Sequence, residues 1–292
     1  PCRAIPVPMD PAALGSLQFI LQPTLFVRLF VVVFVIGRWV DHAITSYAID
    51  EQITEADNPA LAISLSGYYL GIAIIFIGTA LGPSQGLEMD LVLMGGYSLG
   101  GILLLLLSRL INDRFILRDF STQEELIEDQ NMGTGIVLFA GYVASALIVA
   151  GSLHGQGGGP HTALAFYAIG QVALVAFTWL YDLVTPYDLH QEIEEDNFAA
   201  GIGFGGALVA IGIIIMRAVS GDFVGWAADL QYLGLNILIV FVYLLGVRLF
   251  FDRLVLANAD LQHEIVRDRN VGAGLLEFTV SIGFASVLFF VL

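Results

Sequence analysis

Glu55-Ala56-Asp57-Asn58-Pro59-Ala60 is the stretch that decides the fold, because its acidic residue, asparagine and small residue recur three more times. Each copy opens an apolar segment, and the later copies read Glu128-Asp129-Gln130-Asn131-Met132-Gly133, Glu194-Glu195-Asp196-Asn197-Phe198-Ala199 and Asp268-Arg269-Asn270-Val271-Gly272. The four asparagines are 73, 66 and 73 residues apart, so equivalent copies in the two halves are 139 residues apart. This spacing predicts a two-helix unit that is duplicated, and then duplicated again as a pair.

The composition is that of a membrane protein. Of the 292 residues, 57% are hydrophobic and only 13% are charged, whereas soluble domains contain about 25% charged residues. A span needs about 20 apolar residues, and eight segments meet this length: 17–40, 59–81, 91–111, 132–153, 162–183, 198–219, 230–251 and 271–292. We therefore predict an all-α polytopic membrane protein with eight transmembrane helices, built from four parallel two-helix repeats.

The arginines predict an orientation for these spans. Three connections are almost free of arginine, whereas the four that hold the motifs lie beside most of the 11 basic residues. Because short loops rich in Lys and Arg stay inside, the motif loops are expected in the cytoplasm and both termini outside. The expected parts are an outward-facing N-terminal segment at 1–16, a first four-helix half at 17–157 and a second at 158–292.

The motif has two interpretations. Asparagine and aspartate are favoured helix N-caps, and acidic residues there complement the helix dipole. Alternatively, four acidic caps around a common axis form a ring at a cytoplasmic mouth, as in cation pathways. Small residues after each cap place these four helices in the packed interior. The residues concerned are Asp57, Asn58, Asp129, Asn131, Asp196, Asn197, Asp268 and Asn270.

Arginines at the ends of two other spans form a second repeated signature. Arg109 and Arg114 match Arg248 and Arg253 at the offset of 139, and an aspartate follows the first arginine of each pair after four residues. Residues four apart share one helix face, so Arg109 can meet Asp113. We interpret these arginines as topology anchors and C-terminal caps, with a ligand-binding arginine cluster as the alternative.

Two charged residues lie deeper in the predicted spans. Arg28 is ten residues from Arg38, about 15 Å along a helix, and Glu277 is seven residues, about 10 Å, beyond Asn270. Charges within a span are usually paired, and a ring of repeats would place the first and eighth helices side by side. Arg28 and Glu277 therefore either pair with each other or extend to opposite membrane surfaces.

Several classes of function are disfavoured. A net charge of -16 opposes binding to nucleic acid, which needs a basic footprint. The chain has no phosphate loop, HExxH motif or nucleophile elbow, so we expect no enzyme, no cofactor and no metal site. Cys2 is the only cysteine, which excludes a disulfide within the chain and leaves acylation of Cys2 as an open alternative.

In this chain, an acidic residue and an asparagine open a span rich in small residues, and the same pattern returns after a span that ends in arginine. This arrangement resembles the YjfL-like integral membrane family (domain of unknown function 350). Members of that family have four spans with two such motifs, so this chain looks like a tandem fusion of two four-helix units. The resemblance implies a multi-pass protein of the bacterial inner membrane. It implies no established activity, although the family's genes often accompany envelope-maintenance and polyamine-related genes.

Two hypotheses for function follow. The first is a channel or transporter for cations or small cationic solutes, entered through the acidic mouth. The second is a non-transporting scaffold, either an envelope-stress component or an accessory subunit of a larger membrane complex. The expected partners are the lipid bilayer and either other membrane subunits or further copies of the chain. A water-filled path lined by carboxylates favours the first hypothesis, and a dry, packed interior favours the second.

Overall fold

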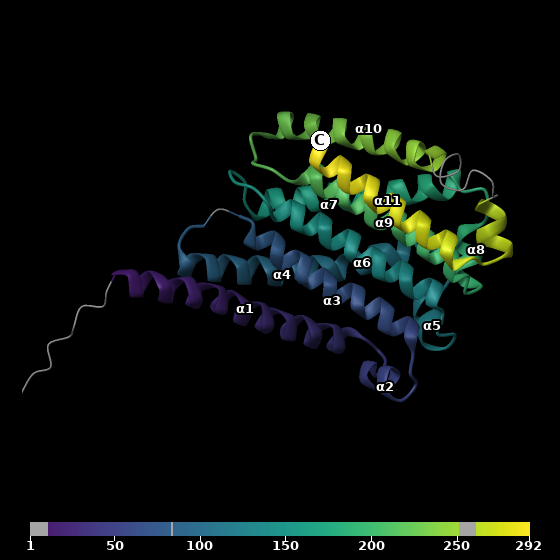
Figure 1. Cartoon of the computed structure of the whole chain (residues 1–292), viewed down its shortest axis with the longest axis horizontal. Helices are drawn as coiled ribbons and strands as arrows, with labels where there is room; N and C mark the ends of the chain where they lie inside the picture. Colours follow the sequence, from purple (N-terminus) through teal and green to yellow (C-terminus); the bar gives the residue numbers. More distant parts are fainter. Residues whose placement is uncertain (1–10, 83, 251–260) are drawn as a thin grey trace, which may run out of the picture.

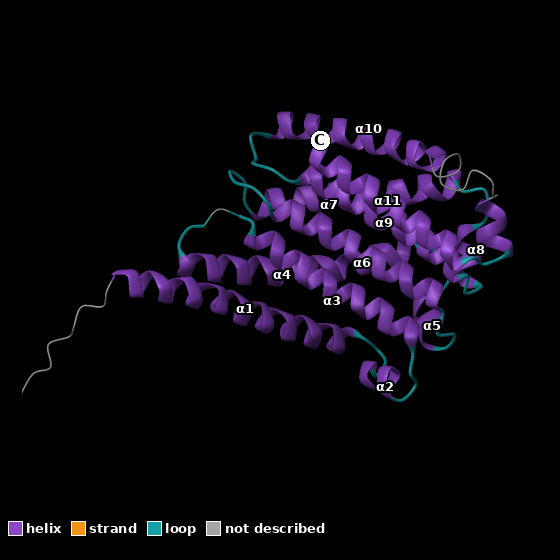
Figure 2. Cartoon of the chain, viewed as in Figure 1, coloured by secondary structure: helices purple, strands orange, loops and turns teal. Residues whose placement is uncertain are grey.

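The computed structural model describes residues 11–82, 84–250 and 261–292, and every regular element within them is a helix (Figure 2). The long helices are α1 (Pro11–Ile44), α3 (Pro59–Ala80), α4 (Leu87–Phe115), α6 (Met132–Leu153), α7 (Pro160–Val184), α9 (Phe198–Val219), α10 (Trp226–Phe250) and α11 (Val271–Val291). The short elements are α2 (Ile49–Thr54), α5 (Thr122–Ile127), α8 (Leu189–Glu194) and the π-helical turn η2 (His263–Arg267).

Within the described residues, seven helices are long and apolar enough to cross a membrane: α1 from Gln22 to Ile44, α3, α4, α6, α7, α9 and α11. The remaining long helix, α10, has a shorter apolar part over Trp226–Val240. The chain is thus an all-helical polytopic membrane protein with seven candidate spans, where the sequence predicted eight. The difference concerns α10 alone, which occupies the place of the seventh predicted span.

The four helices that follow the motifs form a row. Helix α3 packs against α6, α6 against α9 and α9 against α11, and these three contacts are by far the most extensive in the molecule. Helices α4, α7 and α10 each lie beside two neighbours in this row, while α1 packs against α3 and α4. All four motifs lie at one end of the bundle, near α2, α5 and α8 (Figure 1). The repeats are therefore parallel, as predicted, and not inverted.

The ring of four repeats, which the second interpretation of the motif required, is wrong. Among the described helices, no comparable contact joins α3 to α11, and α1 and α11 lie toward opposite edges of the bundle (Figure 1). We call each contact between successive helices of the row a joint. The row stays open because an inner helix uses opposite faces for its two joints. In α6, Gly135 faces α3, and Gly133 faces α9. Opposite faces continue a row, whereas a closed ring requires adjacent faces to be used.

Small residues allow the helix backbones of the row to touch. A side chain added to Gly135 would place its Cβ 2.6 Å from the Ala60 carbonyl oxygen, and one added to Gly201 would lie 2.6 Å from the Gly133 carbonyl oxygen. Gly274 makes the equivalent contact with the backbone of Ala199. In each joint the residue four positions after one asparagine meets the residue two positions after the preceding asparagine. Backbone contact of this kind is how small residues drive association of membrane helices.

Candidate functional site: the motif joints and the two polar chambers

All four motif asparagines are helix N-caps, as predicted. The Oδ1 atoms of Asn58, Asn131 and Asn197 accept the backbone N–H of the third residue that follows, at 3.0, 2.8 and 3.3 Å. Asn270 accepts from both Gly272 and Ala273, at 3.0 and 3.3 Å. Each asparagine therefore satisfies an N–H that the first helical turn leaves without a partner.

Three of these asparagines also bind the repeats to one another, which sequence reasoning missed. The Nδ2 atom of Asn58 donates to the Leu126 carbonyl at 2.7 Å. Asn131 donates to the Ile193 carbonyl at 2.7 Å, and Asn197 donates to the Ile265 carbonyl at 2.8 Å. Each acceptor belongs to the short helix of the next repeat, so one side chain caps its own helix and ties it to its neighbour.

Each of the four asparagines also has a side-chain partner earlier in its own repeat. Nδ2 also donates to a side-chain oxygen five or six residues earlier, and the backbone N–H donates to that same residue's carbonyl. These acceptors are Gln52, Glu125, Glu192 and Glu264. Burial raises the pKa of the Glu125 carboxyl, and the hydrogen bond from Asn131 opposes that rise. The recurrent acceptor before each asparagine was the available sequence signal.

The motif aspartates do not form the predicted acidic ring. Asp57, Asp129, Asp196 and Asp268 are exposed and follow the row of helices from one repeat to the next. Asp57 and Asp196 adopt left-handed backbone conformations, with φ of 50° and 55°, which aspartate tolerates better than most residues. Asp196 also accepts the Gly133 N–H at 3.2 Å, so it caps the helix of the preceding repeat.

Arg109 lies in a small polar chamber at the motif end of the first repeat. Its guanidinium is 3.5 Å from Asp41 and 3.9 Å from Asp113, which confirms that Arg109 and Asp113 share one face of α4. Asp41, on α1, is only 4% exposed. Tyr47 and Tyr142 also line this chamber, whose volume of about 20 Å³ suits a single water molecule. Sequence reasoning missed Asp41, which nothing in the motif pattern marks.

Of the other predicted arginines, Arg114 has a described side chain, and it does not line this chamber. Arg114 is exposed in the last turn of α4, which agrees with a C-terminal cap. Arg248 lies in α10, but its side chain is outside the described part of the structure, as are Arg253 and Cys2. All the residues that line the chamber belong to the first half of the chain.

The predicted pair of Arg28 and Glu277 is wrong. Arg28 is exposed on α1, whereas Glu277 is 5% exposed on α11, toward the opposite edge of the bundle (Figure 1). Tyr181 donates its hydroxyl to Glu277 at 2.8 Å. The pairing required a ring, and an open row separates the first and last helices. Gly203 of α9 makes room for the carboxylate, because a Cβ there would lie 2.7 Å from Glu277 Oε2.

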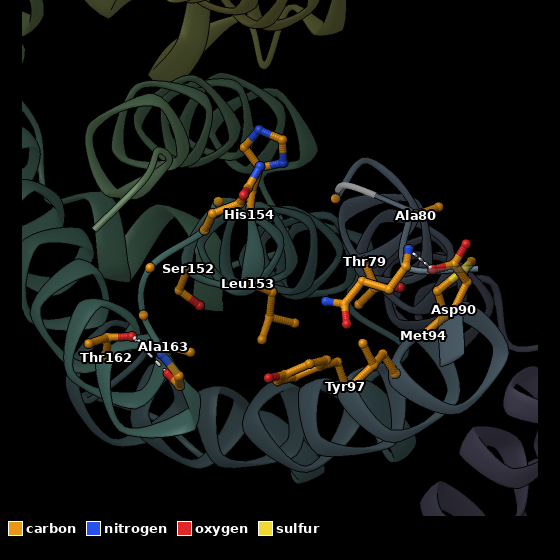
Figure 3. A pocket seen from close by; sticks show the side chains of 18 of the residues that line it. Thr79, Ala80, Asp90, Met94, Tyr97, Ser152, Leu153, His154, Thr162 and Ala163 are labelled. Atoms are coloured by element: carbon orange, nitrogen blue, oxygen red, sulfur yellow. Dashed lines mark hydrogen bonds between the residues drawn. The ribbon is translucent and has the colours of Figure 1, made fainter. Parts of the chain in front are cut away.

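A second polar chamber opens at the other end of the bundle. It has a volume of about 600 Å³ and lies between α3, α4, α6 and α7. Tyr97 and Leu153 point into the opening, with Asp90 and Thr162 at its two sides (Figure 3). Asp90 accepts hydrogen bonds from Ser84 and from the Gln85 N–H, at 2.6 and 2.7 Å. Sequence reasoning did not single out this chamber.

A layer of buried apolar side chains separates the two chambers. Along α3, Thr79 lines the large chamber and Tyr68 lines the small one. Between them lie four apolar side chains that are at most 2% exposed: Ile72, Ile75, Ile102 and Leu105. A Cβ on Gly101 would lie 2.5 Å from Ile75 and 3.2 Å from Val149, so little space remains. This part of the bundle between the chambers is closely packed by apolar side chains.

Comparison with known proteins places the chain in a family. A UPF0719 transmembrane protein of Aquifex aeolicus is 23% identical over 237 residues, which cover 78% of this chain and 84% of the relative. YshE of Bacillus subtilis, a UPF0719 transmembrane protein, is 27% identical over 42% of this chain and 87% of its own length.

The UPF0719 inner membrane protein YjfL of Escherichia coli is 25% identical over 40% of this chain and 83% of its own length. No solved structure matches the chain. The family model described as Domain of Unknown Function (DUF350) matches twice, over residues 16–153 and 157–292. The chain therefore belongs to the DUF350 family and carries two of its units in tandem.

Proposed function

We propose that this chain is a non-transporting membrane scaffold that serves as an accessory subunit or assembly platform for membrane proteins. The supporting observation is the packed interior of the row. The central helices α6 and α9 meet their neighbours through backbone contacts at Gly135, Gly201 and Gly212, and 18 of the 22 residues of α9 are buried. A rigid row of this kind holds its surface residues at fixed spacings, which suits a platform.

The proposal includes a topology. Helix α10 is a further span, the seventh of eight in chain order, because it has 25 residues and occupies the position that the repeat requires. The motif loops lie in the cytoplasm and both termini lie outside, in line with the distribution of arginines. The similarity to YjfL, which is named an inner membrane protein, supports the bacterial inner membrane as the location.

A second candidate function is the passage of cations or small cationic solutes through the first half. The observation in its favour is the alignment of the two polar chambers along α3 and α4, with only the apolar layer between them. Asp90 faces the large chamber, and Asp41 and Asp113 line the small one. In this alternative the layer at Ile75 is a closed gate.

Flux measurements on the full chain in proteoliposomes decide between the two candidates. The scaffold proposal predicts that potassium, sodium and spermidine cross no faster than in protein-free vesicles. Saturable flux of any of these cations would refute the proposal. Ile75→Ala, which opens the apolar layer, and Asp41→Asn, which removes a chamber carboxylate, would then show whether the flux uses the two chambers.

A further inference from the structure

The row of repeats has one joint fewer than it has repeats. In three joints, the residue two positions after an asparagine packs against the next repeat; these residues are Ala60, Gly133 and Ala199. The fourth such residue, Gly272, is exposed, and a Cβ built there would meet only the Asn270 side chain. Asn270 is exposed as well, whereas the other three asparagines are at most 1% exposed.

The outer face of α11 carries small residues at positions that the other three helices bury in their joints. A groove on this face is lined by Asn270, Gly272, Leu275, Leu276 and Thr279, with Glu264 beside them. Gly283 continues the face, and a Cβ there would meet nothing within 4 Å. Thr279 occupies the position of Gly67 and Gly206, nine residues after the asparagine, where the earlier helices contact Phe139 and Phe278 of the next repeat.

The outer face of α3 carries the complementary half of a joint. In the three joints, the incoming helix presents a glycine four residues after its asparagine: Gly135, Gly201 and Gly274. The equivalent residue of α3 is Ala62, and Ser66 and Ala73 continue small residues along the same face at the positions of Gly205 and Gly212. None of these three α3 residues is buried.

We propose that the α11 face docks the α3 face of a second copy of this chain, so that copies join head to tail in the membrane. The argument is continuity, because the exposed faces are the two halves of an interface that the chain already makes three times. Asn270 Nδ2 would donate to the Ile53 carbonyl of the next copy, since Ile53 is the α2 residue equivalent to Leu126 and Ile193. An interface of this heterologous kind produces oligomers larger than dimers. The inference deepens the proposed scaffold function and rests on it.

The test is disulfide cross-linking in native membranes, in a Cys2→Ser background. Ser66→Cys and Thr279→Cys correspond to Gly205 and Ala140, in that order, whose Cβ positions lie 3.3 Å apart in the second joint, close to the roughly 3.5–4.5 Å of a disulfide. The chain with both cysteines should give a ladder of dimers and larger oligomers. A mixture of the two single-cysteine chains should stop at dimers. Leu107→Cys with Thr279→Cys, an exposed pair off the proposed interface, should give no ladder.

A second variant tests the groove itself. Gly272→Leu should fill it and weaken the cross-link roughly tenfold or more, the factor expected when a packed interface must admit an extra side chain. Gly100→Leu, at an exposed glycine of α4 with nothing within 4 Å, should leave the ladder unchanged. Monomers only, or a ladder that Gly272→Leu does not weaken, would overturn the inference. Either result, together with absent cation flux, would leave the scaffold proposal standing.

Discussion

The joint at Asn131 and the open end at Asn270 use the same residue in two environments. Both asparagines cap a helix and donate to a glutamate of their own repeat. Asn131 donates in addition to two carbonyls of the next repeat and is 1% exposed, whereas Asn270 is exposed. The comparison separates two tasks of one motif, because capping needs only the residue's own helix, while joining needs a following repeat.

The largest expected difference between joint and end concerns glycine. Gly201→Leu would push a side chain into the backbone of Gly133, so it should destabilise the folded protein by about 3 kcal/mol or more. Gly272→Leu adds the same atoms at the open end and should change monomer stability by no more than about 0.5 kcal/mol. Thermal unfolding of the detergent-solubilised protein, followed by circular dichroism, measures both. Equal losses would show that the end is as closely packed as the joint.

Alanine in place of asparagine should show the next largest difference. Asn131→Ala removes a cap, worth about 0.5–2 kcal/mol, and also removes the hydrogen bonds to the Ile193 and Glu194 carbonyls of the next repeat, worth about 0.5–1.5 kcal/mol each. Asn270→Ala removes the cap and a bond to Glu264 of its own repeat, as Asn131→Ala does with Glu125, but no bond to another repeat. We expect the stability loss at Asn131 to be about twice that at Asn270 when both are measured by the same unfolding assay. A loss at Asn270 as large as that at Asn131 would contradict the division into capping and joining.

The aspartates before the caps offer a matched pair with a smaller effect. Asp57 and Asp196 have the same left-handed backbone, but only Asp196 accepts the Gly133 N–H across a joint. Alanine at either site loses the same tolerance of a left-handed backbone. The difference in unfolding free energy between Asp196→Ala and Asp57→Ala therefore isolates the hydrogen bond from the Gly133 N–H. We expect Asp196→Ala to be the more destabilising by about 0.5–1.5 kcal/mol. Identical melting temperatures would remove Asp196 from the joint.

The smallest expected effect is a dependence on pH at the second joint. Burial raises the pKa of Glu125, so the folded state favours its protonated form. Glu125 therefore lowers the free energy of unfolding as the pH rises from the pKa of the unfolded state, about 4.3, through the raised pKa of the folded state. Glu125→Gln should abolish this component, because Gln52 holds Asn58 in the same way without a charge. Parallel pH curves for the two proteins would contradict the assignment.

The residues and the spacing of the four motif copies predicted the caps and the parallel repeats, because both depend on features that are local in the sequence. Asparagine before an apolar run is an N-cap wherever the helix packs, so Asn58, Asn131, Asn197 and Asn270 could be placed from the sequence. The row could not be predicted, because spacing along the chain says nothing about which face of α6 meets α3. The pairing of Arg28 with Glu277 failed for this reason.

The hydrogen bonds across the joints could not be predicted either, since their acceptors are backbone carbonyls, at Leu126, Ile193 and Ile265. A carbonyl group is present in every residue and leaves no mark on the sequence. Asp41 was missed for a different reason. It comes from α1, and only the packing of α1 against α4 brings it to Arg109.

The open row is the central claim, and the distance between its ends tests it most directly. Spin labels on cysteines replacing Asp57 and Asp268, both exposed at the motif end, report this distance by pulsed electron paramagnetic resonance in a Cys2→Ser background. Labels at Asp57 and Asp129 give the spacing of neighbours, about 8–10 Å between packed helices. Dilution with unlabelled protein keeps the signal within one chain. The row predicts an end-to-end separation about three times the neighbour spacing, and equal distances would show a closed ring and contradict the account.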